Sequence, residues 1–495
     1  MKYSKILTLL CAALLLLPAC QSNVKKDTAT QKPNIIYILA DDLGYGDLGC
    51  YGQEKISTPN IDNMAENGLL FTQHYAGSTV CAPSRSSLLS GHHTGHTYIR
   101  GNKEVQPEGQ YPLADKVLTF AEVLQEAGYE TGAFGKWGLG MTGTEGSPNN
   151  QGFNEFFGYL CQRYAHRYYP SYLWQNDQKY WLEGNDWTSK EVYGPDVIHK
   201  KTLEFIRDHK DEPFFVYVPS LIPHAEIIAP EDSFLNMYNG RFDETPWGIG
   251  NTKSHYQGND YGSEHFKIAG YSPVINPRAS FAAMVSRLDH HVGEIIALLD
   301  ELGLSDNTLI MFSSDNGPHT EGGADPDFFN SNSIFKGYKR DLYEGGIRVP
   351  MIATWPGKIK PNTETDHLSA FWDVFPTVAD IAGAEIPDDI DGISFLPTLL
   401  GKKEQQKHHE YLYWEFHERG GRRALRKGNW KMVHYQMFNP AKSTVELFNI
   451  AADPAEQYNR ASDHPEIVEE LTKLMDSAHT PSELFPIESR MVPTQ

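Results

Sequence analysis

Short apolar runs alternate along this chain with longer segments of helical period. Four runs rich in β-branched and aromatic residues lie at residues 35–40, 131–134, 214–218 and 308–312, and polar residues follow each of them closely. This alternation of strands and helices is typical of a doubly wound α/β domain. In open sheets of this kind ligands bind outside the carboxyl ends of the strands, so the polar residues there are the first candidates for a site.

Helices are expected between these strands because capping residues flank the segments of helical period. Thr58 is suited to begin one helix, and Gly128 and Gly303 are suited to end two others. The predicted helices span residues 59–67, 116–126, 195–209 and 278–302. Their apolar faces would cover the sheet.

Two segments lack a clear period, and the C-terminal part changes character. Residues 138–187 and 230–276 are expected to be surface excursions that wall a cleft. After about Leu400, short apolar runs predict a small antiparallel sheet and a closing helix. The expected fold class is therefore α/β, with a large mixed, mostly parallel sheet sandwiched by helices over residues 33–400 and an α+β subdomain over residues 401–495.

The N-terminus has the features of an export signal. A short basic start precedes an apolar run over residues 6–17 that is too short to span a membrane, and Cys20 follows a small residue. This resembles a bacterial lipoprotein cleavage site, so residues 1–20 are expected to be a signal peptide and residues 21–32 a tether. The mature protein would then lie in the periplasm or cell envelope, with membrane contact only through lipid on Cys20. Ordinary secretion with cleavage nearby is the alternative.

Composition narrows the classes of function. The chain has 495 residues, of which 22% are charged and 40% hydrophobic, as in ordinary globular proteins. Its formal net charge of −21 argues against nucleic acid as a partner, because binders of phosphate backbones carry a basic excess or a basic face. Three of the five cysteines lie beyond the signal, too few for a disulfide framework; Cys50 and Cys161 are either paired or buried free thiols.

Oxygen-bearing side chains follow two of the predicted strands. Asp41 and Asp42 come directly after the first, and Asp315 and Asn316 follow the run at 308–312. Adjacent carboxylates repel unless a cation or water lies between them. Each pair alone indicates only a turn at a strand end, but together they form an all-oxygen set suited to calcium or magnesium and poor for zinc.

A cysteine lies at the start of another predicted helix. Pro83 suits the first position of this helix, which would place Cys81 just before the N-terminus, where the helix dipole favours anions. The alternative is that Cys81 is a buried thiol and Ser84 a capping residue.

At this point the sequence resembles a known family, the type I sulfatases of the alkaline-phosphatase superfamily. Cys81-Ala-Pro-Ser-Arg85 matches the Cys-x-Pro-Ser-Arg signature around their modified cysteine. The resemblance covers about residues 33–460 and is greatest to arylsulfatase and N-acetylgalactosamine-sulfatase members. The further matching segments, all in the family's order, are Asp41-Asp42, Gly135-Lys136-Trp137, residues 313–317 and residues 339–350.

The resemblance implies a modified nucleophile beside a metal ion. A separate maturation enzyme would oxidise Cys81 to formylglycine, whose hydrate has one hydroxyl to attack sulfur and another to expel sulfate as the aldehyde re-forms. One calcium ion would raise the acidity of the attacking hydroxyl. Its implied ligands are Asp41, Asp42, Asp315, Asn316 and the modified Cys81.

The resemblance also implies roles for basic residues. Arg85 would hold the hydrate and balance the carboxylates, while Lys136 and Lys339 would contact sulfate oxygens. His224, after a predicted strand, would protonate the leaving oxygen. The alternative for each is a solvated or structural basic residue.

One departure from the family concerns the residue two positions after Lys136. The family usually has a histidine there, and this chain has Gly138. His93 and His96 are candidates to replace it, or are packing or substrate contacts. Arg163, His166 and His417 are expected to contact a sugar, with a wall that only packs against the protein body as the alternative.

The expected function is calcium-dependent, exo-acting hydrolysis of sulfate esters on carbohydrates, with a weak preference for galactose-configured sugars. The expected partners are a sulfated carbohydrate and the formylglycine-generating enzyme. Two alternatives stay open: a phosphoester or phosphonate hydrolase of the same superfamily, and a lipoprotein that binds sulfated glycans without turnover.

Overall fold

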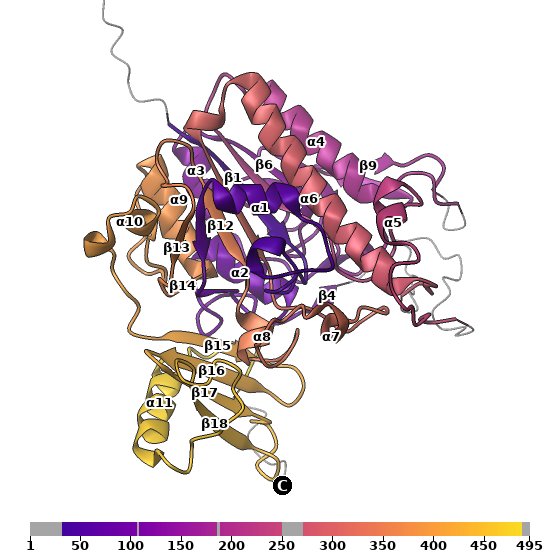
Figure 1. The fold of residues 1–495 in the computed structure, drawn as a ribbon. Helices are drawn as coiled ribbons and strands as arrows, with labels where there is room; N and C mark the ends of the chain where they lie inside the picture. The colour runs from indigo at the N-terminus through magenta and orange to yellow at the C-terminus, as the bar shows by residue number, and fades with distance from the viewer. Residues whose placement is uncertain (1–31, 106–107, 186–188, 250–270, 488–495) are drawn as a thin grey trace, which may run out of the picture. The chain divides into compact units, whose positions relative to one another are not determined.

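The computed structural model describes residues 32–105, 108–185, 189–249 and 271–487. Within them, a sheet has the strand order β13-β2-β12-β11-β1-β10-β6-β7-β8-β9 (Figure 1). The central strands are β1 (Asn34–Ala40), β10 (Phe214–Pro219), β11 (Thr308–Ser314), β6 (Glu130–Lys136) and β7 (Glu155–Tyr159). The outer strands are β12 (Met351–Thr354), β2 (Leu69–Phe71), β13 (Thr363–Thr365), β8 (Tyr172–Gln175) and β9 (Gln178–Trp181).

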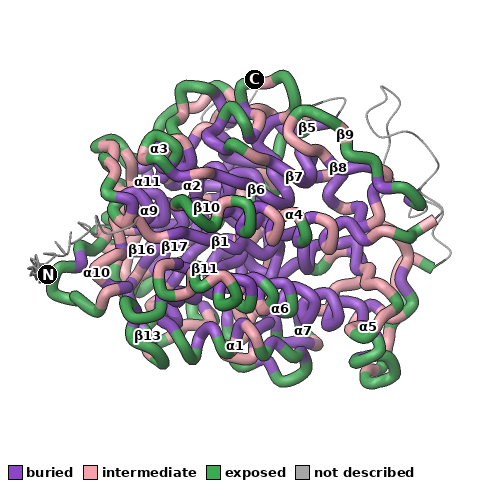
Figure 2. Tube along the Cα trace, turned by 90° about the horizontal axis from the view of Figure 1, so that it is seen from above, coloured by how far each residue is buried: buried purple, intermediate pink, exposed green. Residues whose placement is uncertain are grey.

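The central strands are parallel and the outer ones mixed. β1 pairs in parallel with β10 and β11, β10 pairs with β6, and β6 with β7. β12, β8 and β9 enter antiparallel pairs. Every residue of β1 is buried, as expected of a parallel strand covered on both faces, and Figure 2 shows the middle of the sheet buried.

Helices cover both faces of the sheet. Ile36 and Ile38 of β1 pack with the apolar sides of α1 (Pro59–Glu66), α4 (Gly194–Asp208) and α6 (Pro277–Leu302). Their neighbours Ile35, Tyr37 and Leu39 point to the other face. There they pack with α2 (Cys81–Ser90), α3 (Phe120–Glu126) and α9 (Val374–Ala382).

The C-terminal part forms its own antiparallel sheet. Its strands, in order, are β15 (Leu412–Phe416), β16 (Arg422–Lys427), β17 (Trp430–Tyr435) and β18 (Thr444–Asn449). α11 (Pro465–Ser477) packs on one face through Leu471 and Met475. On the other face Trp414 donates a hydrogen bond to the carbonyl of Ala76 at 2.9 Å. The predicted fold class is confirmed, while the domain boundary at residue 400 stays a prediction.

The remaining elements are short. The helices are α5 (Ser233–Tyr238), α7 (Pro326–Phe329), α8 (Glu344–Ile347) and α10 (Leu396–Leu399). The strands are β3 (His74–Tyr75), β4 (Glu104–Val105), β5 (Gly109–Gln110) and β14 (Ser369–Ala370). Single 3₁₀ turns lie at Gly49–Tyr51, Pro148–Asn150, Tyr164–His166, Ser305–Asn307, Phe371–Asp373 and Lys403–Gln405.

Two expectations need correction. Residues 138–187 are more than a surface excursion, because β7, β8 and β9 from this segment extend the sheet; glycines and aromatic residues obscured their strand pattern. α3 begins four residues later than predicted, because Thr119 caps it.

Among the described residues Cys50, Cys81 and Cys161 are free, so the disulfide alternative is excluded for them. The predicted signal and lipid site lie outside the described residues, and none of the described helices is long and apolar enough to cross a membrane.

Candidate active site

The carboxyl ends of the parallel strands meet at one edge of the sheet, and the predicted site residues gather there. Asp41 and Asp42 directly follow β1, Lys136 ends β6, and Asp315 directly follows β11. Because β1 lies between β10 and β11 in parallel register, the residues that leave these strands are brought together. The carbonyl of Ala40 accepts a hydrogen bond from the amide of Asp315 at 3.0 Å, which continues the pairing beyond the strands.

Cys81 is the first residue of α2 and is buried. The helix therefore starts two residues earlier than predicted, with Pro83 at its third position, where its missing N–H still costs no hydrogen bond. Ser84 makes no cap; its hydroxyl accepts a hydrogen bond from the amide of Gly77 at 3.1 Å. Val80 precedes the helix in an extended conformation.

The thiol of Cys81 lies between an anion and a cation. Its Sγ is 3.4 Å from Asp41 Oδ1 and 3.4 Å from Lys136 Nζ. Burial, followed by the charge of Asp41, raises the pKa of the Cys81 thiol well above its ordinary value, although Lys136 acts in the opposite direction. The unmodified side chain is therefore protonated at neutral pH and a poor nucleophile.

Three buried cations neutralise three buried carboxylates around this thiol. Lys136 Nζ lies 2.6 Å from Asp41 Oδ2, and Lys339 Nζ lies 2.7 Å from Asp42 Oδ2. Arg85 binds Asp315 Oδ2 through Nη2 at 2.8 Å and through Nε at 3.1 Å. Burial would raise the pKa of the Asp41 carboxyl, but Lys136 and other cations hold it well below its ordinary value.

The donor set fits a hard divalent cation. Asn316 Nδ2 donates to Asp42 Oδ1 at 2.7 Å, while Asn316 Oδ1 is buried and has no hydrogen-bond partner among the described residues. Ligand atoms of Asp41, Asp42, Cys81 and His224 lie within 4.8 Å of one another. An orphaned amide oxygen beside carboxylates is the environment that calcium satisfies.

His224 lies beside the lysine and the carboxylate pair. Its Nε2 is 3.1 Å from Lys339 Nζ and 3.4 Å from Asp42 Oδ2, and its Nδ1 donates to the carbonyl of Ala225 at 2.5 Å. The ring stacks on His166 at 4.8 Å and on His319 at 5.7 Å between centroids. Burial, then Lys339 and Lys136, lowers the pKa of His224 well below its ordinary value, so the imidazole is neutral here.

A cavity of about 320 Å³ opens over these groups. Arg163 and His166 line it as predicted, and Arg163 forms an ion pair with Glu104 at 2.7 Å. Several other lining residues carry no recognisable signal in the chain pattern. These are Asn102, Glu104, Gln110, Gln162, Tyr271 and Arg340.

Three predicted histidines do not line this cavity. His96 Nδ1 lies 2.9 Å from Asp391, and His93 stacks on His96 with 4.3 Å between centroids. His417 Nε2 lies 3.0 Å from Glu415 Oε1, in a buried ion-pair group. The structure therefore places His93, His96 and His417 in packing contacts, apart from the residues around Cys81.

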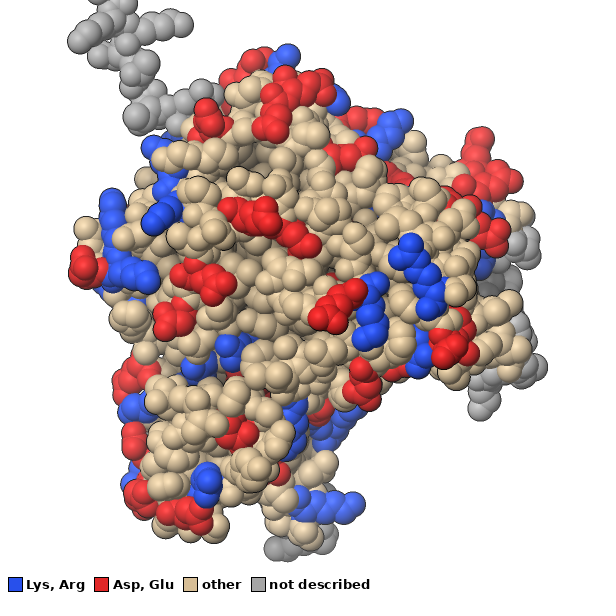
Figure 3. Space-filling model, in the orientation of Figure 1, with Lys and Arg blue, Asp and Glu red and all other residues tan. Residues whose placement is uncertain are grey.

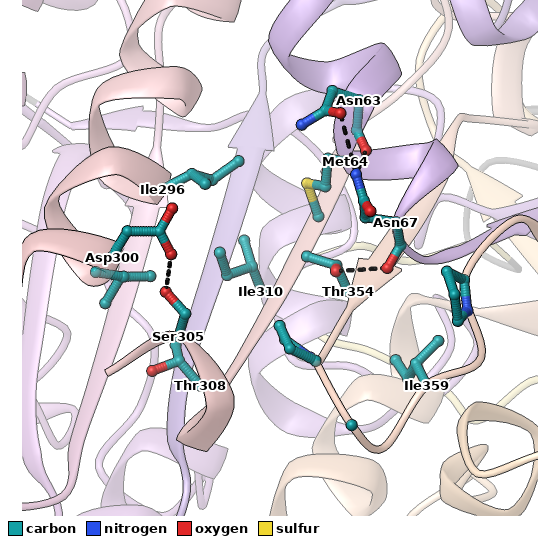
Figure 4. Close-up of a pocket in the computed structure, with 14 residues that line it drawn as sticks. Asn63, Met64, Asn67, Ile296, Asp300, Ser305, Thr308, Ile310, Thr354 and Ile359 are labelled. Carbon is teal, nitrogen blue, oxygen red and sulfur yellow. Dashed lines mark hydrogen bonds between the residues drawn. The ribbon is translucent and has the colours of Figure 1, made fainter. Parts of the chain in front are cut away.

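A larger cavity of about 380 Å³ lies at the opposite end of β11, where Thr308 begins this strand (Figure 4). Apolar side chains and amides form most of its wall, with Asp300 hydrogen-bonded to Ser305. Its lining, taken from the described residues, contains neither lysine nor arginine, so it is unsuited to an anion. Charges of both signs are interspersed on the face drawn in Figure 3. The lining of the Cys81 cavity, in contrast, includes Lys136, Arg163, Lys339 and Arg340, which would attract an anion.

The fold and this site define a hydrolase that acts on an anionic ester, with a candidate reacting residue at a helix N-terminus and buried cations around it. The Sulfatase family model matches residues 33–384, and the model described as N-sulphoglucosamine sulphohydrolase, C-terminal, matches residues 335–480.

Relatives and solved structures agree with this class. N-acetylgalactosamine-6-O-sulfatase of Bacteroides thetaiotaomicron is 30% identical, over 96% of this chain and 99% of the relative. Human arylsulfatase A is 30% identical, over 89% and 82%. The crystal structure of Ps i-CgsB in complex with k-i-k-neocarrahexaose is 27% identical with a TM-score of 0.71, over 90% and 92%. The chain belongs to the sulfatase family and is a sulfuric ester hydrolase.

Proposed function

We propose that this sulfatase is an exo-acting, calcium-dependent enzyme that removes sulfate esters from carbohydrates, with galactose or N-acetylgalactosamine as the preferred sugar. A relative of almost equal length is named for N-acetylgalactosamine, and the carrahexaose complex has a sulfatase-like fold with a sugar ligand. The cavity of about 320 Å³, lined by His166, Tyr271 and Arg163, suits a single terminal sugar.

The observation that carries the proposal is the surroundings of Cys81. A protonated thiol at a helix N-terminus, in contact with Lys136 and Asp41, is a poor nucleophile but a well-placed precursor of one. Conversion of Cys81 to formylglycine would supply a hydrated aldehyde with one hydroxyl to attack sulfur and a second to release sulfate. A maturation enzyme that recognises residues 81–85 is the partner this requires.

Calcium, held by Asp41, Asp42, Asp315, Asn316 and the modified Cys81, would bind sulfate oxygens and acidify the attacking hydroxyl. The protein's own residues do the remaining work. Lys136 Nζ lies 3.4 Å from Cys81 Sγ, so Lys136 would orient the nucleophile formed at this position.

Arg85 fixes the carboxylates that would bind the metal, because its guanidinium contacts both Asp315 and Asp41. Lys339 and His224 share a short N–N contact of 3.1 Å, and this pair holds the proton that the leaving sugar oxygen needs. Within this pair, His224 is the residue that lies beside His166, because the two imidazole rings stack on each other.

The experiment is sulfate release from sulfated galactose, N-acetylgalactosamine and glucosamine, with a phosphonate monoester in the same panel. Conversion of Cys81 is first checked by mass spectrometry. Release from one sugar that stops with a chelator and in Cys81→Ala supports the proposal. Hydrolysis of the phosphonate ester in place of the sulfate esters supports the phosphonate-hydrolase alternative. Absence of any release from converted, calcium-loaded protein points to a larger glycan substrate or to the binding-protein alternative.

Export and lipid attachment at Cys20 complete the proposal. An enzyme held in the periplasm or cell envelope by one N-terminal lipid would be in the compartment where it meets sulfated glycans outside the cytoplasm. Metabolic labelling with a fatty-acid probe tests the attachment, which requires that the label disappear in Cys20→Ala.

A further inference from the structure

The wall of the Cys81 cavity contains two buried amides that the proposed mechanism does not use, Gln110 and Gln162, and of these Gln162 is the one with an unpartnered donor. Gln162 is 6% exposed and lines the cavity together with Cys81, Lys136 and His224. Within the described part of the chain, Gln162 Nε2 is buried and has no hydrogen-bond partner. A buried donor without an acceptor is unfavourable, so a ligand that supplies an acceptor would be stabilised here.

Gly138 makes the room that this amide occupies. It lies two residues beyond the end of β6, at φ +79°, and its amide donates to the carbonyl of Leu160 at 3.1 Å. A Cβ atom at position 138 would lie 2.4 Å from Gln162 Nε2 and 2.7 Å from Gln162 Cγ. The side chain of Gln162 therefore fills the space that a side chain at position 138 would take.

Gln162 lines the same cavity as the cations that would receive an anion. Lys136, Lys339 and Arg340 line the same cavity, and Lys136 contacts Cys81 directly. A sulfate group offers acceptor oxygens and no donor, which matches the free N–H groups of Gln162. A neutral amide adds a donor without another charge, whereas the nearby Arg163 is already paired with Glu104.

We propose that Gln162 is a substrate-binding residue whose side-chain amide donates a hydrogen bond to a sulfate oxygen, and that Gly138 is a positioning residue that admits this side chain. The inference rests on the proposed function, because it assigns the ligand of the same cavity.

The test is isothermal titration calorimetry with inorganic sulfate as the probe, on calcium-loaded protein whose Cys81 is converted. Gln162→Ala should weaken sulfate binding about 5- to 10-fold, as expected for one lost hydrogen bond. Gln162→Glu has nearly the same shape but presents an anion, so it should weaken binding more than Gln162→Ala. Gly138→Ala, which displaces the amide without removing it, should also weaken binding.

Gln151→Ala is the matched control, because Gln151 is also buried but does not line the cavity. Its sulfate affinity should equal that of the wild type. Unchanged affinity in Gln162→Ala and Gln162→Glu overturns the inference, whatever their activity. The proposed function fails separately if wild-type protein releases no sulfate from any ester; absence of sulfate binding by wild-type protein overturns the inference alone. If Gln162→Ala does not fold, the sulfate affinities of Gln162→Glu and Gly138→Ala test the inference.

Discussion

At the scale of single residues, the site depends on pairs of opposite charge that are removed from water. Lys136, Lys339 and Arg85 each neutralise a carboxylate, and all are almost fully buried. Removing one partner of such a pair leaves an uncompensated buried charge, which is far more costly than the pair is stabilising. Substitutions of these cations would therefore affect folding and activity together, and His224 is the better residue for a mechanistic test.

His224→Ala should lower kcat on a sugar sulfate by about 10²- to 10⁴-fold, the usual contribution of general acid catalysis, because the proton for the leaving oxygen is shared between Lys339 and His224 Nε2. The loss should be much smaller on a nitrophenyl sulfate, because its leaving oxygen needs little protonation. Steady-state kinetics on both substrates measure the difference.

The control for this prediction is His290→Ala. His290 is about half exposed and lies near Glu294, on α6. His290→Ala should leave kcat on both substrates unchanged. An equal loss on the sugar sulfate and the aryl sulfate in His224→Ala would show that His224 has no role in protonating the leaving group.

At the scale of elements, helix ends decide what reaches the site. α2 starts at Cys81, so the side chain of the proposed nucleophile projects from the first turn of the helix. α3 starts at Phe120 because Thr119 and Glu122 form a capping box: Thr119 Oγ1 accepts from the amide of Glu122, whose side chain accepts from the amide of Thr119 at 2.8 Å. A capping box can therefore fix the start of a helix even where the helical spacing of apolar residues extends further toward the N-terminus.

Thr119→Ala should destabilise the protein by about 1–2 kcal/mol, because it removes the cap and the hydrogen bond to the carbonyl of Gln151. The midpoint of urea unfolding, followed by circular dichroism, measures the change. Thr142→Ala is the control, since Thr142 is exposed in a loop and should change stability by less than about 0.5 kcal/mol. Equal midpoints for both variants would contradict a stabilising role for this cap.

At the scale of the whole molecule, a buried ion group connects the C-terminal sheet with α8. Lys431 of β17 lies 2.9 Å from Glu344 and 3.0 Å from Glu456, and the amide of Glu344 donates to Glu456 at 2.6 Å. Burial and the charge of Glu344 raise the pKa of Glu456 to about 7, against the lowering effect of Lys431. Burial would also raise the pKa of Glu344, but Lys431, Arg348 and Arg426 lower it to about 2.

This arrangement predicts stability that depends on pH. A carboxyl with a raised pKa keeps its proton in the folded protein at a pH where the unfolded chain has lost it. Stability from Glu456 should therefore be greatest below its ordinary pKa of 4.5 and should fall as the pH rises to about 7. The size of this loss is set by the difference in proton affinity of Glu456 between the folded and the unfolded chain. Glu344 titrates below this window and does not contribute to it.

Glu456→Gln should remove this dependence, because an amide does not titrate. Unfolding free energies from pH 4.5 to 7 measure it, with the exposed Glu126→Gln as control. Parallel curves for wild type and Glu456→Gln would show that Glu456 is ionised in the folded protein throughout this range.

The sequence alone determined the central strands and the fold class, and it predicted a candidate nucleophile and a set of candidate oxygen ligands at the ends of these elements. Buried parallel strands appear in the sequence as continuous apolar runs, and residues at their carboxyl ends lie at the same edge of the sheet. Local pattern is therefore enough to predict that Asp41, Asp42, Asp315 and Asn316 lie together as candidate ligands. The motif around Cys81 is also recognisable without the fold, because its residues are contiguous in the sequence.

Only the tertiary structure decided which other side chains reach the site. His93 and His166 are both histidines in loops, yet the first packs near Asp391 and the second stacks on His224, because neighbouring segments orient them. Gln162 enters the cavity because Gly138, on the adjacent strand exit, has no side chain. Contacts between residues distant in sequence carry no periodic signal, so chain pattern cannot specify them.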